Sequence, residues 1–268
     1  MPNPVDFFIH IPKTAGSTMS QIIESQYPKG TVLSFRETRI GNDERARRVT
    51  GIGPDIRIVA GHLHYGQAQL FGRECRPFTM LRDPTERMIS LYYYLAREPM
   101  HPNHEAFKRG EVSFEKIARR HGRAQACFIA GVLQKDSCPD DELLNRAKDI
   151  LEKVIVCAGL TERFDESLLV YNRILGWNVR SYVRANVTKN RPTQDSLAPS
   201  DIAIIRECSR VDQQVYDFAK SLFEKQIASM PPTFVEELAA LRRNVKVARG
   251  VTWIGKNLGR VRNALKLN

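Results

Sequence analysis

The chain has 268 residues, of which 42% are hydrophobic and 26% are charged. This composition is typical of a soluble globular protein, and the length suits one large α/β domain or two small ones. Of the formal net charge of +11, eight positive charges follow Glu237, the last acidic residue, which leaves about +3 for the rest of the chain. We expect no nucleic acid partner, because nucleic-acid-binding proteins carry their positive charge across a folded face.

The cysteine pattern and the N-terminus bear on the cellular compartment. The five cysteines are far apart and form no C-x-x-C pair, which argues against a disulfide framework and against a zinc site. The first residues lack a charged region followed by an apolar one, and no apolar run has the length of a membrane span. We therefore expect a cytoplasmic protein.

Short apolar segments alternate with amphipathic ones along the chain. The pattern predicts strands at residues 5–11, 56–60, 78–81 and 154–158. It predicts helices at residues 19–28, 88–95, 166–175 and 201–223. Residues 97–150 carry little recognisable pattern. The alternation predicts an α/β fold, with a P-loop-like parallel β-sheet flanked by helices.

Three unusual segments each follow directly after a predicted strand. They are KTAGST at 13–18, GHLH at 61–64 and RDPTER at 82–87. Ligands of open parallel sheets bind beyond the carboxyl ends of the strands. We therefore expect the three segments to converge at one edge of the sheet.

The first of these segments, preceded by Pro12, lies between a strand and a helix, which is a phosphate-binding arrangement. Its small residues allow the backbone to approach an anion, and the N–H groups that open the helix point toward it. Lys13 adds a positive charge, and Thr14, Ser17 and Thr18 can donate hydroxyl hydrogen bonds. The alternative interpretation is an ordinary strand-to-helix turn capped by Ser17 or Thr18.

This segment differs from the phosphate loop of nucleotide triphosphatases. That loop has the pattern G-x-x-x-x-G-K-[ST], with the lysine late and a hydroxyl that binds magnesium. Here the lysine comes first, and the sequence has no convincing acid for magnesium. We expect a phosphate-like ligand held without a metal, and a phosphate-loop kinase remains the less favoured alternative.

The segment that begins at Arg82 predicts a second phosphate site. Arg82 can bind a phosphate with two parallel hydrogen bonds. Asp83 and Pro84 start a helix, and Ser90 lies about two turns along it, within reach of the same anion. We expect Arg87 to pair with acids and brace the helix. The alternative is a helix start that carries a surface arginine.

Together, PKTAGST and the later RDPxxRxxSxYYY resemble the sulfotransferases that use 3'-phosphoadenylyl sulfate (PAPS), closest to the heparan sulfate 2-O-sulfotransferase-like carbohydrate branch. Residues 159–168 and 186–192 add to the likeness, which spans about residues 5–224. The resemblance implies the sulfotransferase fold, PAPS as donor and no metal. It also implies that the first segment holds the 5'-phosphosulfate and the second the 3'-phosphate, through Lys13, Thr14, Ala15, Gly16, Ser17, Thr18, Arg82 and Ser90. By the same resemblance, Lys189 and Arg191 are secondary donor-site candidates.

Sulfuryl transfer needs a base for the acceptor proton, and histidine is suited to this task. The resemblance implies that His62 is this base and that Lys13 stabilises charge on the leaving group. His64 is a candidate substrate contact or helper, although a structural role for one of these histidines stays open. Ala60 stands where the related enzymes have the first histidine of an H-G-H pattern, which puts a polysaccharide acceptor in doubt. His10 is expected to be a packed core histidine.

The chain divides into a sulfotransferase domain at residues 1–230 and a basic amphipathic helical extension at residues 231–268. Apolar residues recur along the extension at Ile254, Leu258, Val261 and Leu265. One interpretation docks this helix on its own domain or on a second copy in a homodimer, and the other is a peripheral contact with anionic lipid or a polyanionic acceptor. The expected acceptor is a carbohydrate hydroxyl, with a small metabolite or a lipid hydroxyl as the alternative.

Overall fold

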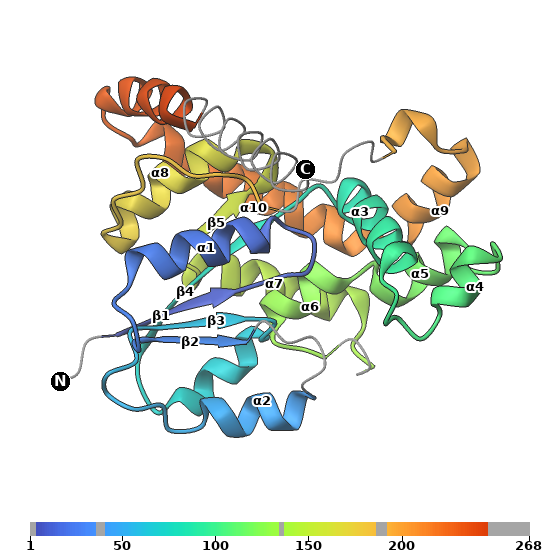
Figure 1. The fold of residues 1–268 in the computed structure, drawn as a ribbon, viewed down its shortest axis with the longest axis horizontal. Coiled ribbons are helices and arrows are strands. Elements are labelled where there is room, and N and C mark those ends of the chain that lie inside the picture. The colour runs from blue at the N-terminus through green and yellow to red at the C-terminus, as the bar shows by residue number, and fades with distance from the viewer. Residues whose placement is uncertain (1–3, 36–40, 134–136, 186–191, 246–268) are drawn as a thin grey trace, which may run out of the picture.

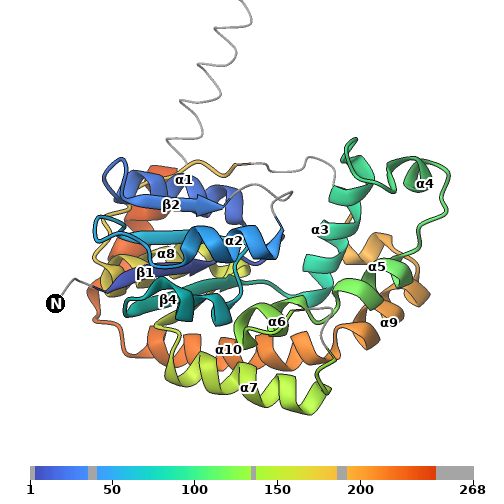
Figure 2. The ribbon, with the colours of Figure 1, turned by 90° about the horizontal axis from the view of Figure 1, so that it is seen from below.

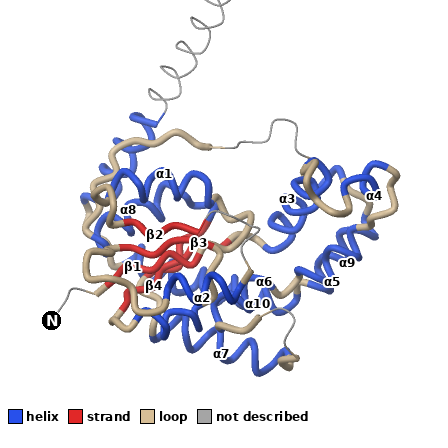
Figure 3. Tube along the Cα trace, turned by 60° about the horizontal axis from the view of Figure 1, so that its bottom comes forward, coloured by secondary structure: helices blue, strands red, loops and turns tan. Residues whose placement is uncertain are grey.

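The structure is a computed structural model that describes residues 4–35, 41–133, 137–185 and 192–245 (Figure 1). Its centre is a five-stranded sheet in the order β2-β3-β1-β4-β5, in which every pair of neighbouring strands is parallel. The strands are β1 Val5–Ile9, β2 Val32–Phe35, β3 Ile58–Gly61, β4 Cys75–Leu81 and β5 Cys157–Leu160. Helices surround this sheet (Figure 3). The predicted α/β class, with a parallel sheet flanked by helices, is confirmed.

The helices lie on both faces of the sheet and beside it. In chain order they are α1 Gly16–Gln26, α2 Asn42–Val49, α3 Pro84–Arg97, α4 His104–Lys108, α5 Phe114–His121, α6 Ala124–Ala130, α7 Asp140–Lys153, α8 Phe164–Leu175, α9 Pro199–Cys208 and α10 Arg210–Ala228. Figure 1 shows α1 and α8 on one side of the sheet and α2 on the other. Because both faces are covered, β1 is buried at all five positions and can be apolar throughout.

Helices α3, α4, α5 and α9 form a group beside the sheet (Figure 2). They have an apolar cluster of their own, separate from the core around the sheet, whose buried members are Met88, Ile89, Leu91, Val112, Phe114, Ile117, Ala118 and Ile205. Much of this group comes from the stretch after residue 97, where the sequence pattern predicted no element. Helices α4 and α5, which come from that stretch, are short, so each has too few apolar positions to produce a clear helical period.

Several predicted boundaries are wrong. The last predicted strand, at 154–158, is β5 at Cys157–Leu160, and strand β2 with helix α2 was not predicted at all. The helix predicted over 201–223 is two helices that meet at Ser209, which is buried. A Cβ on Gly122 would lie 2.1 Å from the carbonyl oxygen of Cys208, so the end of α5 packs directly against this junction.

The described part of the C-terminal extension packs against the sheet domain. Residues 233–245 are helical, and Phe234, Leu241 and Val245 are buried in the main core. Arg173 of α8 pairs with Glu237 at 2.8 Å. The apolar repeat from Ile254 to Leu265 lies outside the described residues. No helix among the described residues combines the length and apolar character that a membrane crossing requires.

Candidate functional site

The three motif segments meet at the carboxyl edge of the sheet. Strand β1 lies between β3 and β4, and Ile9 is in register with Gly61 on one side and with Thr79 on the other. The chain then continues from β1 into residues 12–18, from β3 into His62 and from β4 into Arg82. The backbone N–H of His10 donates to the carbonyl of Gly61 at 2.9 Å. The predicted convergence of the three segments is confirmed.

The loop between β1 and α1 has an unusual backbone conformation. Lys13 and Ala15 have φ angles of 74° and 64°, and they are the non-glycine residues with positive φ in the described part of the chain. This left-handed conformation costs an L-residue about 1–2 kcal/mol, and such strain gathers at ligand sites. In anion-binding loops, left-handed and right-handed residues in succession turn several N–H groups toward one side.

The start of α1 argues against the simpler interpretation of this loop. The N-cap residue is Ala15, which makes no side-chain cap, so neither Ser17 nor Thr18 caps the helix as an ordinary turn would require. The N–H groups of Thr18 and Met19 donate to the carbonyl of Ala15. The helix therefore opens without a side-chain cap.

The three hydroxyl groups of the loop differ in their surroundings. Thr14 is buried, and its hydroxyl donates to the carbonyl of Ile11 at 2.9 Å, which stabilises the loop. The hydroxyl oxygen of Thr18 accepts from the N–H of Ala185 at 3.0 Å, while Ser17 is exposed. Ala185 directly precedes the segment with Lys189 and Arg191, and both of these predicted donor-site residues lie outside the described residues.

Arg82 joins the first segment to the second. Its Nη1 donates to the carbonyl of Lys13 at 3.2 Å, and its Nη2 pairs with Glu86 at 3.3 Å. The ammonium group of Lys13 lies 4.1 Å from the ring centroid of Tyr94 on α3. Ser90 is partly buried on the same helix, one turn before Tyr94. The two segments predicted to hold opposite ends of one nucleotide are thus in direct contact.

Arg87 has the bracing role that the sequence predicted. Its side chain is 1% exposed, and its Nη2 pairs with Asp212 of α10 at 3.3 Å and donates to the carbonyl of His121. Asp212 is 0% exposed. This buried ion pair connects α3 to α10 and involves no solvent-facing atom that a ligand could reach.

His62 lies where β3 ends and the chain turns out of the sheet. A Cβ on Gly61 would lie 2.6 Å from the Cβ of Phe35, so glycine is required where β3 passes β2. Burial lowers the pKa of His62 from 6.5 to about 4, and the positive charges of Arg45 on α2 and of His64 act in the same direction. His62 is therefore a neutral imidazole at neutral pH, in the state that can accept a proton.

His10 is part of this site rather than only a core residue. Its ring centroid lies 4.4 Å from that of His62, and a Cβ on Gly16 would lie 1.5 Å from its Nε2. The imidazole therefore lies directly over the first residue of α1, and the absence of a side chain there makes room for it. Its place immediately before the anion loop was the signal in the sequence, and the buried strand around it concealed that signal.

His64 lies in different surroundings from His62. It is buried, and its ring stacks on Phe128 of α6 with centroids 4.1 Å apart. Its backbone N–H donates to Oε1 of Gln67 at 2.9 Å, at the start of the 3-10 helix Tyr65–Phe71. These contacts favour the structural role that the sequence left open for one histidine of the pair.

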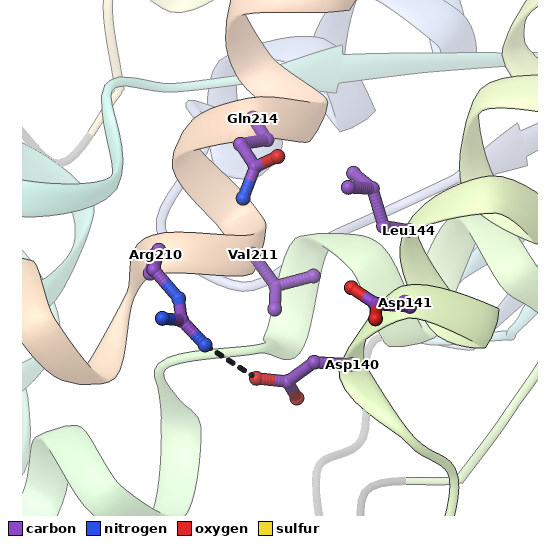
Figure 4. A pocket seen from close by; sticks show the side chains of 6 residues that line it. All are labelled: Asp140, Asp141, Leu144, Arg210, Val211 and Gln214. Atoms are coloured by element: carbon purple, nitrogen blue, oxygen red, sulfur yellow. Dashed lines mark ion pairs between the residues drawn. The ribbon is translucent and has the colours of Figure 1, made fainter.

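A hollow of about 240 Å³ lies elsewhere, between α7 and α10 (Figure 4). It is lined by Asp140, Asp141, Leu144, Arg210, Val211 and Gln214, and Arg210 pairs with Asp140 at 3.5 Å. None of these residues belongs to the three motif segments. Across the ranges that the structure describes, no cluster of three or more histidine, cysteine or acidic side chains is placed to hold a metal ion.

Comparison with known proteins adds curated relatives, while no family model matches the chain. Galactose-3-O-sulfotransferase 3 of Bos taurus is 27% identical over 213 residues, which cover 72% of this chain and 48% of that protein. Its Homo sapiens counterpart is 26% identical over 213 residues, with 72% and 47% covered. The chain thus spans about half the length of the curated relatives that it matches.

Solved structures with a similar arrangement are also sulfotransferases. Mouse sulfotransferase SULT7A1, solved in complex with PAP, has a TM-score of 0.42 and 16% identity, with 76% of this chain and 64% of that chain covered. A sulfotransferase from Alicyclobacillus acidocaldarius has a TM-score of 0.44 and 12% identity, with 84% and 97% covered. The resemblance to carbohydrate sulfotransferases that the motifs predicted is confirmed by the curated sequences, since this chain is similar to galactose-3-O-sulfotransferases over 213 residues.

Proposed function

We propose that this chain transfers the sulfuryl group of PAPS to a carbohydrate hydroxyl. Two contacts carry the proposal: Arg82 donates to the carbonyl of Lys13, and the His10 imidazole lies between the same loop and His62. These contacts support our proposal that the groups for both ends of the nucleotide and a neutral base share one sheet edge. Sequence similarity to galactose-3-O-sulfotransferase 3 supports this chemistry.

The residues of the loop fit a phosphosulfate group. The left-handed backbone at Lys13 and Ala15 and the uncapped start of α1 suit a loop whose N–H groups bind an anion, and Lys13 supplies a full positive charge. Residues 13–18 would hold the 5' end of the donor. Arg82 and Ser90 would hold the 3'-phosphate, and Lys189 and Arg191 are further candidates in the segment that follows Ala185.

The chain's own groups would act at three points of the reaction. His62 takes the proton of the acceptor hydroxyl while the acceptor oxygen forms its bond to sulfur and the bond from sulfur to the bridging phosphate oxygen breaks. Lys13 stabilises the negative charge that builds on that bridging oxygen. The loop N–H groups hold the three equatorial sulfuryl oxygens, so that the sulfur stays in line between the acceptor oxygen and the bridging oxygen. This proposed scheme assigns no task to a metal ion.

The acceptor that we propose is a galactose-containing glycan, since the curated relatives are named for galactose. A small metabolite or a lipid hydroxyl is the alternative acceptor. The full chain is incubated with sulfur-labelled PAPS and, separately, galactose-terminated oligosaccharides, a panel of small alcohols and phenols, and a glycolipid. Transfer to the oligosaccharide is expected and would be located by mass spectrometry.

The same experiment separates the outcomes. Transfer only to a small alcohol or to the glycolipid would retain the chemistry and replace the acceptor. If calorimetry detects no binding of PAPS or of its diphosphate product, PAPS is not the donor and the proposed activity is refuted. The His62→Ala variant is the matched control, because it should bind the donor without turning it over.

A further inference from the structure

The backbone of Arg82 is held at both of its polar groups by one buried side chain. The N–H of Arg82 donates to Oε1 of Gln125 at 3.0 Å, and Nε2 of Gln125 donates to the carbonyl of Arg82 at 2.9 Å. Gln125 is 0% exposed. A primary amide that pairs with both polar groups of one residue fixes that residue's position and the plane of its peptide groups.

Gln125 is itself held in place. It is the second residue of α6, and its backbone N–H donates to Oδ2 of Asp212 at 3.0 Å, while the N–H of Ala126 donates to Oδ1 at 2.9 Å. The carboxylate of Asp212 thus binds the first turn of α6 and pairs with Arg87. Because each member is buried and hydrogen-bonded, the amide of Gln125 has little freedom to move.

The position of the Arg82 backbone decides where its guanidinium lies. That group reaches the carbonyl of Lys13 across the sheet edge and Glu86 along α3, and it is 15% exposed. A planar guanidinium binds phosphate through paired hydrogen bonds, whose strength depends on its orientation. A shift of the strand end at Arg82 would therefore misdirect it even though the side chain remained.

We propose that Gln125 is a positioning residue for the 3'-phosphate contact of the donor and acts by holding the backbone of Arg82. This inference rests on the proposed function, because it presumes that Arg82 receives the 3'-phosphate. The competing explanation is that Gln125 only ties β4 to α6 and contributes to stability. The two explanations differ in whether discrimination for the 3'-phosphate changes when Gln125 is replaced.

The test compares two nucleotides that differ only in that phosphate. Calorimetry measures the binding of 3',5'-diphosphoadenosine and of adenosine 5'-monophosphate to the full chain and to Gln125→Leu. The preference is the ratio of the dissociation constants for the monophosphate and the diphosphate. We expect this ratio to be about tenfold smaller in the variant, as for the loss of one charge-assisted hydrogen bond. Its affinity for the monophosphate should remain close to that of the wild type.

The matched control is Tyr171→Phe. Tyr171 is also fully buried and bridges two backbone groups, since its hydroxyl donates to the carbonyl of Thr79 and accepts from the N–H of Gly159. This variant should lose stability in a urea titration yet keep the wild-type preference for the diphosphate. If Gln125→Leu does not fold, Gln125→Met serves in the same comparison, because it keeps the length of the side chain and removes both groups that hold the backbone of Arg82.

Each result has one meaning. If both Gln125 variants keep the wild-type preference for the diphosphate, the inference is overturned and the proposed function stands. An equal loss of preference in Tyr171→Phe would also overturn it, since loss of stability would then explain both. If the wild-type chain does not distinguish the two nucleotides, the proposed function fails and the inference fails with it.

Discussion

Replacing Asp212 by alanine would test the buried network that connects α3, α6 and α10. The carboxylate pairs with the guanidinium of Arg87 at 3.3 Å and accepts hydrogen bonds from the backbone N–H groups of Gln125 and Ala126 at 3.0 and 2.9 Å. Alanine removes every one of these acceptor positions. The positive charge of Arg87 would remain in a place where its side chain is 1% exposed.

The expected loss can be worked from these contacts. Removing one partner of a buried ion pair costs about 3–5 kcal/mol, because the remaining charge stays buried without its counterion. The two N–H groups that open α6 also lose their acceptor, but these contributions share one carboxylate and do not add. We therefore expect Asp212→Ala to lower the free energy of unfolding by about 4 kcal/mol. Domains of this size have about 5–15 kcal/mol in total, so the variant should fold but melt far earlier.

Urea denaturation, followed by the fluorescence of the buried Trp177, measures this loss. The control is Glu115→Ala on α5, whose ion pair with Arg119 is exposed at 66% for the arginine and 45% for the acid. That pair should contribute far less to stability, because water and salt screen exposed charges. A double variant of Arg87→Met and Asp212→Ala should lose less than the two single losses combined, because neither charge is then left unpaired. The reasoning is refuted if Asp212→Ala and Glu115→Ala lose the same amount.

Four further predictions concern the site. His62→Ala should lower turnover by about 10²–10⁴-fold and leave the affinity for the diphosphate product unchanged in calorimetry; normal turnover would remove His62 as the base. Burial lowers the pKa of His62 to about 4, and protonation removes the base, so kcat/KM should fall only as the pH drops toward 4. A pH–rate profile in which kcat/KM is halved near pH 6.5 would contradict this shift. Gly16→Ala places a Cβ 1.5 Å from Nε2 of His10 and should lose about 1–3 kcal/mol in urea titrations, unlike Gly53→Ala, where nothing lies within 4 Å. Lys13→Ala should reduce turnover in single-turnover assays with saturating donor, and an unchanged rate would show that Lys13 does not stabilise the leaving group.

Local pattern was sufficient for the elements that carry the motifs. The apolar run of β1 ends at Ile9, and the helical period after Pro84 continues through α3 to Arg97. These segments are buried against the core over several residues, so their hydrophobic periodicity is strong. The bracing role of Arg87 was also predictable, since an arginine within an apolar helix face needs an acid.

Other features depend on contacts between distant segments. The helical period runs without interruption from α9 into α10, and the break at Ser209 coincides with the close approach of Gly122 to Cys208. His64, a candidate substrate contact or helper in the sequence, is buried and stacks on Phe128 of α6. In both cases the deciding neighbour is far away in the chain, and no local pattern encodes it.

By itself, the sequence determined that a candidate anion loop, an arginine and a histidine each follow a buried strand. It also determined that these groups would share one edge, because parallel strands present their carboxyl ends together. Only the tertiary structure decided that β1 lies between β3 and β4, that His10 lies over Gly16, and that Gln125 holds Arg82. The physical reason is that residue type and period express local burial, whereas the order of strands and the pairing of buried polar groups arise from packing between segments far apart in the chain.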